Sequence, residues 1–371
     1  MTKKDYLLKL LLKIIPCSVY DRIQGKRLIN KIETSAMKIN ENTYYICNNK
    51  AKKTKYILFR LEDSYGLFAC AFCMLFYFDW AKKMGLMPLM VHGYENELKK
   101  GNYFYENLWE YCFEQEDINR VLKEENIIVY AINGGITLRE TCYKLNNDIF
   151  DMRVHAKINS YRDYYRKVYE LTQRNWKFND VVQKKVEDEY SKLLQKQGKI
   201  MAVILREEFS LEKEEMTEAE KKVYCQHPKA LTLEETYQKI LEYMNKWECE
   251  YVYVSTMFLE SIAFFVERLE DRVVYFPRQR KMFQDYMNAL RKGWEYSDNK
   301  DSDNYERNRK EYWRDQRKIN EQDYCAEIMV AAKCDYCIGV KSSGLIAALA
   351  LNGGQYKDIY IFEDKNLIDR Y

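Results

Sequence analysis

Short apolar runs alternate with amphipathic segments along this chain, a pattern typical of alternating strands and helices. In the first half the pattern predicts strands at 54–63, 87–93 and 126–134, and a long buried helix at 64–86 that ends near Gly85. Strands joined through helices by short connections favour a parallel sheet. We therefore expect the first half to be an α/β domain.

The second half repeats this organisation. The pattern predicts strands at 199–207, 251–256, 272–277 and 336–340, and helices at 231–247, 258–269, 327–334 and 345–351. Thr232 directly precedes the amphipathic part of the first of these helices and is expected to cap it. A second doubly wound α/β domain follows from this order.

Between the halves, residues 150–195 are polar, aromatic and helical in pattern, which predicts a helical bridge. We place a first domain at 1–195, including an N-terminal arm and this bridge, and a second domain at 196–354. Residues 355–371 are expected to be a C-terminal tail that returns to the first domain.

Composition narrows the possible partners. The chain of 371 residues is 47% hydrophobic, and its 60 basic and 57 acidic side chains give a net charge of +3. This balance argues against a basic surface for nucleic acid. Eleven cysteines without framework spacing and only three histidines favour reduced thiols in a cytoplasm over disulfides or a zinc site.

The N-terminal segment raises two alternatives. No signal peptide is visible and no run approaches the ~20 apolar residues of a spanning helix, so we expect a cytoplasmic protein. Residues 1–32 nevertheless place leucines and isoleucines on one side and lysines on the other, up to Pro16. This segment is either an interfacial helix at the inner face of the membrane or an arm packed on the domain.

Candidate chemistry gathers where predicted strands of the second half end. Arg206, the pair Ser255-Thr256 and the turn Ser342-Ser343-Gly344 each follow an apolar strand. Ligands of doubly wound sheets lie outside the carboxyl ends of strands. An arginine, hydroxyl groups and a helix N-terminus together suit a diphosphate. The alternatives are a helix-capping serine and an ion pair of Arg206 with a neighbouring glutamate.

Other motifs limit the enzyme class. Asp301-Ser302-Asp303 matches a metal-binding D-x-D triplet, but it lies in a polar run at 286–323 that is typical of a solvated loop. No metal is therefore expected. Neither G-x-x-x-x-G-K-[ST] nor G-x-G-x-x-G occurs, which argues against a kinase or an epimerase.

Four short motifs occur in order across residues 55–354. They are Asp63-Ser64-Tyr65-Gly66 with Gly85-Leu86-x-Pro88, then Ile204-Leu205-Arg206-Glu207-Glu208-Phe209, then Ser255-Thr256-Met257-Phe258, and finally Glu327 followed by Ser342-Ser343. In this arrangement the chain resembles the fucosyltransferase superfamily of GT-B glycosyltransferases, which includes α-1,2-, α-1,6-, nodulation and protein O-fucosyltransferases.

The chain departs from the pattern of that family. The family strand ends in His-x-Arg-Arg-x-Asp, of which only the first arginine is present, as Arg206. Ile204, Glu207 and Phe209 stand in place of the histidine, the second arginine and the aspartate, and no acidic pair follows Ser255-Thr256. These losses imply either a different donor or acceptor, or a catalytically degenerate relative that only binds a nucleotide or a glycan.

The resemblance implies two Rossmann-like domains with a cleft between them, the first on the acceptor side and the second binding the nucleotide sugar. It implies metal-independent, inverting transfer of fucose from GDP-fucose to a glycan or lipid-linked glycan, in surface polysaccharide or glycoconjugate synthesis, without a cofactor.

Site roles follow from the resemblance and from position at strand ends. The donor is expected to contact Tyr65, Gly66, Arg206, Thr256, Glu327, Ser342, Ser343 and Gly344. Glu327 suits a guanine because a carboxylate accepts from its N1–H and exocyclic amine together; the alternative is a helix-surface glutamate. The catalytic candidates are Arg206, Glu207 and Glu208, and the acceptor-side candidates are His92 and Tyr94. His92 is alternatively a core histidine.

Overall fold

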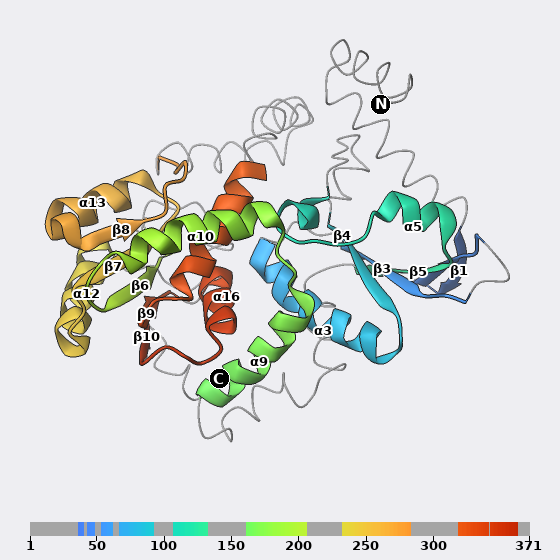
Figure 1. Cartoon of the computed structure of the whole chain (residues 1–371), viewed down its shortest axis with the longest axis horizontal. Coiled ribbons are helices and arrows are strands. Elements are labelled where there is room, and N and C mark those ends of the chain that lie inside the picture. Colours follow the sequence, from blue (N-terminus) through green and yellow to red (C-terminus); the bar gives the residue numbers. More distant parts are fainter. Residues whose placement is uncertain are drawn as a thin grey trace, which may run out of the picture. The chain divides into compact units, whose positions relative to one another are not determined.

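The computed structural model (Figure 1) describes residues 36–40, 43–48, 53–61, 67–92, 107–132, 161–205, 232–282, 318–340 and 342–362. The chain divides into two compact units. The first comprises Met1–Asn147, Asn175–Asn179 and Arg307–Arg314, and the second comprises Asp148–Arg174, Asp180–Glu306 and Asp315–Tyr371. Each unit holds a five-stranded sheet with parallel strands, so the α/β class of both halves is confirmed. The cleft expected between the domains stays a prediction.

The first unit has the strand order β1-β2-β5-β3-β4. The bounds are Ala36–Asn40 for β1, Thr43–Ile46 for β2, Tyr56–Leu61 for β3, Met87–His92 for β4 and Ile127–Ile132 for β5. Strand β3 pairs in parallel with β4 and β5, whereas β2 is antiparallel to both β5 and β1. The three predicted strands therefore form a parallel side of the sheet, which an antiparallel hairpin extends.

Helices cover both faces of this sheet. Helix α3 (Leu67–Lys83) joins β3 to β4, and its Tyr77 ring lies 5.3 Å from the ring of Phe59, centroid to centroid. It ends just before Gly85, whose φ of 72° is the left-handed conformation that glycine adopts readily. The 3-10 helix η1 (Leu108–Tyr111) and α5 (Ile118–Glu124) follow β4. Residues of α5 share a core with the opposite face of the sheet, including Tyr56, Leu58 and Val129.

The second unit has the strand order β10-β9-β6-β7-β8, and all neighbouring strands are parallel. The bounds are Ile200–Ile204 for β6, Tyr251–Ser255 for β7, Val273–Tyr275 for β8, Tyr336–Gly339 for β9 and Ile359–Ile361 for β10. Every residue of the central strand β6 is buried, as expected for a parallel strand that is covered on both faces.

Helices on opposite faces enclose this second sheet. Helices α12 (Leu233–Trp247) and α13 (Leu259–Leu269) share one core with the face that carries Val203 and Val254. A helix over 318–331 and α16 (Ser343–Asn352) lie on the other face, where the Tyr253 hydroxyl donates to the Glu327 carbonyl oxygen at 3.3 Å. Figure 1 shows α12 and α16 on either side of β6. The 3-10 helix η3 (Glu270–Arg272) leads into β8.

Local signals in the sequence explain where α12 begins. Thr232 caps this helix, because its hydroxyl accepts from the Glu235 N–H at 3.1 Å while the Glu235 carboxylate accepts from the Thr232 N–H at 2.9 Å. This reciprocal pair is a capping box. The cap expected at Thr232 is confirmed.

Helices α9 (Tyr161–Asn175) and α10 (Asp180–Leu194) form the segment that the sequence assigned to the first domain. Their side chains contact residues of the second unit. Arg162 Nη2 of α9 donates to the Lys357 carbonyl oxygen at 2.5 Å, and Lys185 Nζ of α10 lies 2.5 Å from Asp323 Oδ1. Apart from residues 175–179, both helices therefore belong to the second compact unit.

The structure contains three strands that the sequence pattern did not predict. Strands β1 and β2 precede the first predicted strand, and β10 lies within 355–371. Strand β10 pairs in parallel with β9, and residues 363–371 of the expected tail lie outside the described residues. Residues 1–32 and 301–303 lie outside the described residues. None of the helices in the described segments has the length and apolarity to cross a membrane. The cysteines whose side chains are described are free thiols, and all of these but Cys47 are buried.

Asp335 ties three strands together at the amino edge of the second sheet. Its Oδ2 accepts from the Ile200 N–H at 3.0 Å, and its Oδ1 accepts from Lys357 Nζ at 2.6 Å. Its own N–H donates to the Ile200 carbonyl at 2.9 Å. Burial alone raises the pKa of this carboxyl, but the hydrogen bonds from Lys357 and Ile200 outweigh burial and lower the pKa below its ordinary value.

We expect Asp335→Asn to lower the free energy of unfolding at neutral pH by about 1–2 kcal/mol, because bonds from Lys357 and Ile200 to a charged acceptor are weakened. The folded pKa lies below the unfolded one, so this contribution is present above the unfolded pKa of about 3.9 and is lost as pH falls through the folded pKa. Urea unfolding followed by circular dichroism should show the difference from the wild type shrinking as pH falls below about 4. Glu187→Gln, on the exposed face of α10, is the control. If the difference in free energy of unfolding between Asp335→Asn and the wild type did not change as the pH fell, the lowered pKa assigned to Asp335 would be wrong.

Candidate functional site

The five parallel strands of the second sheet end at one edge. The register places Ile204 of β6 beside Ser255 of β7 and Gly339 of β9. The pairing continues one residue further, since the Leu205 N–H donates to the Ser255 carbonyl and the Val340 N–H donates to the Ile204 carbonyl, at 2.9 and 3.0 Å. Neighbouring strands lie about 4.8 Å apart, so the ends of β7 and β9 are about 10 Å apart.

The succession of strands reverses between β6 and β9. Strand β6 leads through α12 to β7 and β8 on one side, whereas β9 leads through α16 to β10 on the other. A reversal of this kind opens a crevice at the carboxyl ends of the two strands, and ligands of open α/β sheets bind there. Arg206 follows β6 at this point in the sequence, but it lies outside the described residues.

The N-terminus of α16 adjoins this reversal. Ser342 caps the helix, and its Oγ accepts from the Leu345 N–H at 3.2 Å. The capping alternative is therefore confirmed for Ser342, while Ser343 and Gly344 form the first turn, whose N–H groups lack intrahelical acceptors. A Cβ at Gly339 would lie 2.8 Å from Leu345 Cδ1, and one at Gly344 would collide with the Tyr324 hydroxyl. Both glycines thus allow close packing of α16.

A buried ion cluster centres on Glu327, in the helix over 318–331. Glu327 Oε2 accepts from Ser255 Oγ at 2.9 Å and from Arg278 Nε at 3.0 Å, and Oε1 accepts from Arg280 Nη2 at 2.7 Å. The side chains of Glu327, Arg278 and Arg280 are 0%, 8% and 3% exposed. The two arginines follow β8 and Ser255 ends β7, so the cluster lies at the carboxyl edge of the sheet.

The two guanidinium groups differ in their electrostatics. Burial lowers the pKa of Arg278, but the charge and hydrogen bonding of Glu327 outweigh it and raise the pKa above its ordinary value. At Arg280, burial prevails over Glu327, and the like charge of Arg278 adds to it, so the pKa falls. Arginine stays protonated in proteins nonetheless, so both groups remain cationic.

These hydrogen bonds occupy the carboxylate of Glu327 in the described conformation. Both carboxylate oxygens accept from side chains of the chain itself, and Glu327 has no exposed surface. In this conformation Glu327 is the shared counter-ion of Arg278 and Arg280 and not a helix-surface residue. Its contact with a guanine base stays a prediction.

Arg278 and Arg280 were missed among the candidates. A clear signal existed, because Arg278-Gln279-Arg280 directly follows the predicted strand at 272–277. The strand-end rule that selected Arg206 and Thr256 applies equally to them.

Thr256, expected at the donor site, is at this edge but buried. Its hydroxyl oxygen accepts from the Phe258 N–H at 3.1 Å, and its carbonyl oxygen accepts from Arg278 Nη2 at 2.8 Å. The residue is 2% exposed. As placed, it shapes the turn after β7 and orients Arg278.

His92, expected on the acceptor side, ends β4 in the first unit and is 2% exposed. Its Nε2 lies 3.4 Å from Cys70 Sγ, and its N–H donates to Asn107 Oδ1 at 2.9 Å. This environment matches the core-histidine alternative. Tyr65, Gly66, Tyr94, Glu207 and Glu208 lie outside the described residues.

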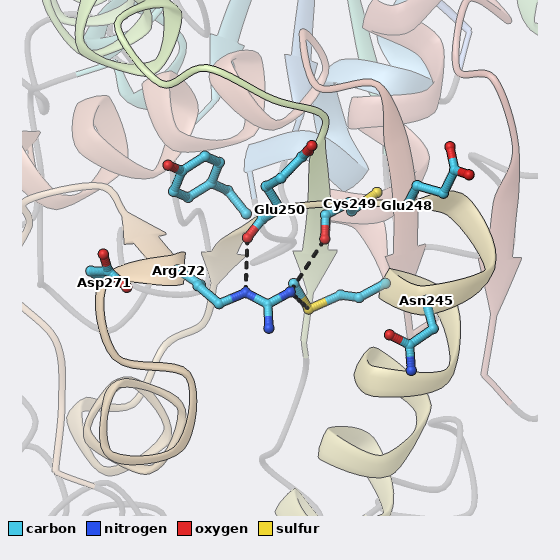
Figure 2. Close-up of a pocket in the computed structure, with 8 residues that line it drawn as sticks. Asn245, Glu248, Cys249, Glu250, Asp271 and Arg272 are labelled. Atoms are coloured by element: carbon cyan, nitrogen blue, oxygen red, sulfur yellow. Dashed lines mark hydrogen bonds between the residues drawn. The ribbon is translucent and has the colours of Figure 1, made fainter.

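A pocket of about 480 Å³ lies at the opposite, amino edge of the second sheet (Figure 2). Arg272 lies across it, with Nε donating to the Glu250 carbonyl at 3.0 Å and Nη2 donating to the Cys249 carbonyl at 3.4 Å. This pocket is remote from the carboxyl edge, and Arg272 serves the backbone of the turn before β7. In the segments with assigned positions, no group of three or more His, Cys, Asp or Glu side chains could hold a metal ion.

Comparisons with known proteins bear on the fold alone. No family model and no curated protein matches the chain. Similar solved structures include the fucosyltransferase NodZ from Bradyrhizobium, with a TM-score of 0.39 and 12% identity over 80% of this chain and 92% of that chain. A NodZ alpha-1,6-fucosyltransferase structure soaked with GDP-fucose gives 0.40 and 13% over 81% and 93%. These proteins belong to the group that the sequence motifs resemble.

We expect Glu327→Gln to lower the free energy of unfolding by about 3–5 kcal/mol, because removing one partner of a buried ion cluster leaves uncompensated charge. Urea unfolding at neutral pH measures this loss. The matched control is Glu242→Gln, which removes a half-exposed carboxylate that pairs with Lys239 at 2.6 Å on α12; such a pair contributes about 1 kcal/mol or less. Equal losses in the two variants would show that the cluster does not stabilise the fold.

Proposed function

We propose that this chain is a glycosyltransferase that moves a sugar from a nucleoside diphosphate to a glycan hydroxyl. The observation that carries the proposal is the reversal between β6 and β9, where the capped N-terminus of α16 adjoins the carboxyl edge of a parallel sheet and Arg206 follows β6 in the sequence. Backbone N–H groups at a helix N-terminus and an arginine fork both favour phosphate oxygens.

The donor we favour is GDP-fucose, on the strength of the four motifs that resemble fucosyltransferases. In this proposal Tyr65 and Gly66 approach the donor from the first domain. Arg206 and the first turn of α16, with Ser342, Ser343 and Gly344, stabilise the charge that develops on the departing diphosphate. Transfer proceeds with inversion and without a metal ion.

Recognition of the base by Glu327 stays part of the proposal. In the described conformation its carboxylate accepts from Ser255, Arg278 and Arg280, so a guanine base has to compete with these bonds.

The acceptor hydroxyl needs a general base within hydrogen-bond reach. Glu207 and Glu208, next to Arg206, are the candidates we retain, since His92 is enclosed in the first unit. A glycan or lipid-linked glycan of surface polysaccharide synthesis is the acceptor class we propose. Residues 1–32 would supply peripheral contact with the membrane, in keeping with a cytoplasmic location.

One observation favours a second function, namely a degenerate relative that binds a nucleotide or a glycan without transfer. Ile204, at the position of the family histidine, is a buried core residue of β6. Its side chain cannot exchange a proton with a substrate.

Thermal unfolding with GDP, UDP, dTDP and GDP-fucose tests the proposal. We expect only the GDP species to stabilise the wild type, by about 2.7 kcal/mol at about 100 times Kd. Arg206→Ala should weaken this effect because a charged partner of the diphosphate is lost. Arg166→Ala, which removes an exposed guanidinium of α9, is the control and should behave as the wild type.

Incubation with GDP-fucose and glycan acceptors then separates the two functions. Release of GDP with formation of a fucosylated product supports the transferase. GDP binding without turnover supports the degenerate relative, and no stabilisation by any nucleotide overturns both.

A further inference from the structure

Among the described residues, the ion cluster at the carboxyl edge of the second sheet contains one more positive than negative charge. Arg278 and Arg280 share the single carboxylate of Glu327, and each side chain is at least nine-tenths buried. An ion withdrawn from water without a counter-charge is costly by several kcal/mol. The fold therefore maintains an excess cation where solvent cannot compensate it.

The same cluster also contains a hydrogen-bond donor without an acceptor among the described residues. The acceptors of Arg280 are Glu327, the Phe276 carbonyl and the Arg278 carbonyl, all reached through its two Nη atoms. Arg280 Nε is buried and has no hydrogen-bond partner in the described part of the chain. Arg278 donates from Nε to Glu327 and from Nη2 to the Thr256 carbonyl. Buried donors without acceptors are rare in folded proteins.

The other neighbours that the structure describes are aromatic rings, which do not supply the missing negative charge. The Tyr324 ring centroid lies 5.5 Å from Arg278 Cζ, and the Tyr275 ring centroid lies 5.4 Å from Arg280 Cζ. These rings attract a cation through their faces but carry no net charge. An excess charge and an N–H group without an acceptor both indicate an oxyanion as the missing partner.

The position of the cluster fits such a ligand. Tyr324 links it to the N-terminus of α16, because the Tyr324 hydroxyl occupies the space that a Cβ of Gly344 would need. The cluster and the first turn of α16 are thus separated by one side chain, at the edge where ligands of open α/β sheets bind.

We propose that Arg278 and Arg280 bind a phosphate-type oxyanion and that Glu327 is a positioning residue that holds the two guanidinium groups for it. Each guanidinium presents its donors in a fixed fork that matches phosphate oxygens. The identity of this oxyanion as a phosphoryl group of the donor rests on the proposed function; the anion site itself does not.

Isothermal titration of the full chain with inorganic pyrophosphate tests the site. We expect Arg278→Lys and Arg280→Lys each to bind pyrophosphate about tenfold more weakly than the wild type or worse, since a charge-assisted hydrogen bond is lost in each. Arg272→Lys is the matched control. It changes a partly buried arginine of the same unit that bonds backbone carbonyls at the opposite edge, and it should bind as the wild type does.

A measurement on the wild type covers the case in which a lysine variant does not fold. Phenylglyoxal modifies arginine side chains, and peptide mapping locates the modified residues. Pyrophosphate should slow modification of Arg278 and Arg280 but not of Arg272. In addition, folded Glu327→Gln should bind pyrophosphate more weakly than the wild type, because the two guanidinium groups are no longer held in place.

The outcomes separate this inference from the proposed function. Unchanged pyrophosphate affinity in folded Arg278→Lys and Arg280→Lys, or absence of protection, overturns the anion site even if GDP-fucose is turned over. Weakened pyrophosphate binding in both variants, in a protein that transfers no sugar, supports the anion site and leaves the transferase proposal without support. No binding of pyrophosphate to the wild type overturns the site outright.

Discussion

The buried carboxylate of Glu327 is the interaction on which the carboxyl edge of the second sheet depends. It joins the end of β7 through Ser255, the segment after β8 through Arg278 and Arg280, and the helix that precedes β9. Each ion is withdrawn from water, so the arrangement is stable only when every partner is in place. The segments at this edge are therefore expected to form or lose their arrangement together. The Thr256 carbonyl is held with them, because it accepts from Arg278.

Much of the architecture could be predicted from the sequence because parallel strands buried on both faces give continuous apolar runs. The runs at 54–63, 199–207 and 251–256 correspond to β3, β6 and β7. Strand β10 could not be predicted in this way. It has only three half-buried residues, and its place is decided by pairing with β9, which residue patterns alone do not encode.

The site was predictable only in part, for a related reason. Strand ends are visible in the sequence, and so are the hydroxyl groups and arginines that follow them. Whether a polar residue at such a point faces solvent depends on partners from distant segments. Glu327 is buried because Arg278 and Arg280, almost fifty residues earlier, bond to it, and His92 is buried beside Cys70 of α3. Spacing cannot distinguish these enclosed groups from exposed ones.

The pairing of β6 with both β7 and β9 also has a consequence during synthesis of the chain. Strand β7 follows β6 closely, but the pair Met201 and Tyr336 joins β6 to a strand that is made much later. At ribosomal rates of about 5–20 residues per second, β6 waits on the order of ten seconds for this second neighbour. Throughout that interval one long side of an entirely apolar strand has no native partner, and an open strand edge is a template for pairing with other chains. The nascent second unit is therefore expected to need protection by a chaperone until β9 emerges.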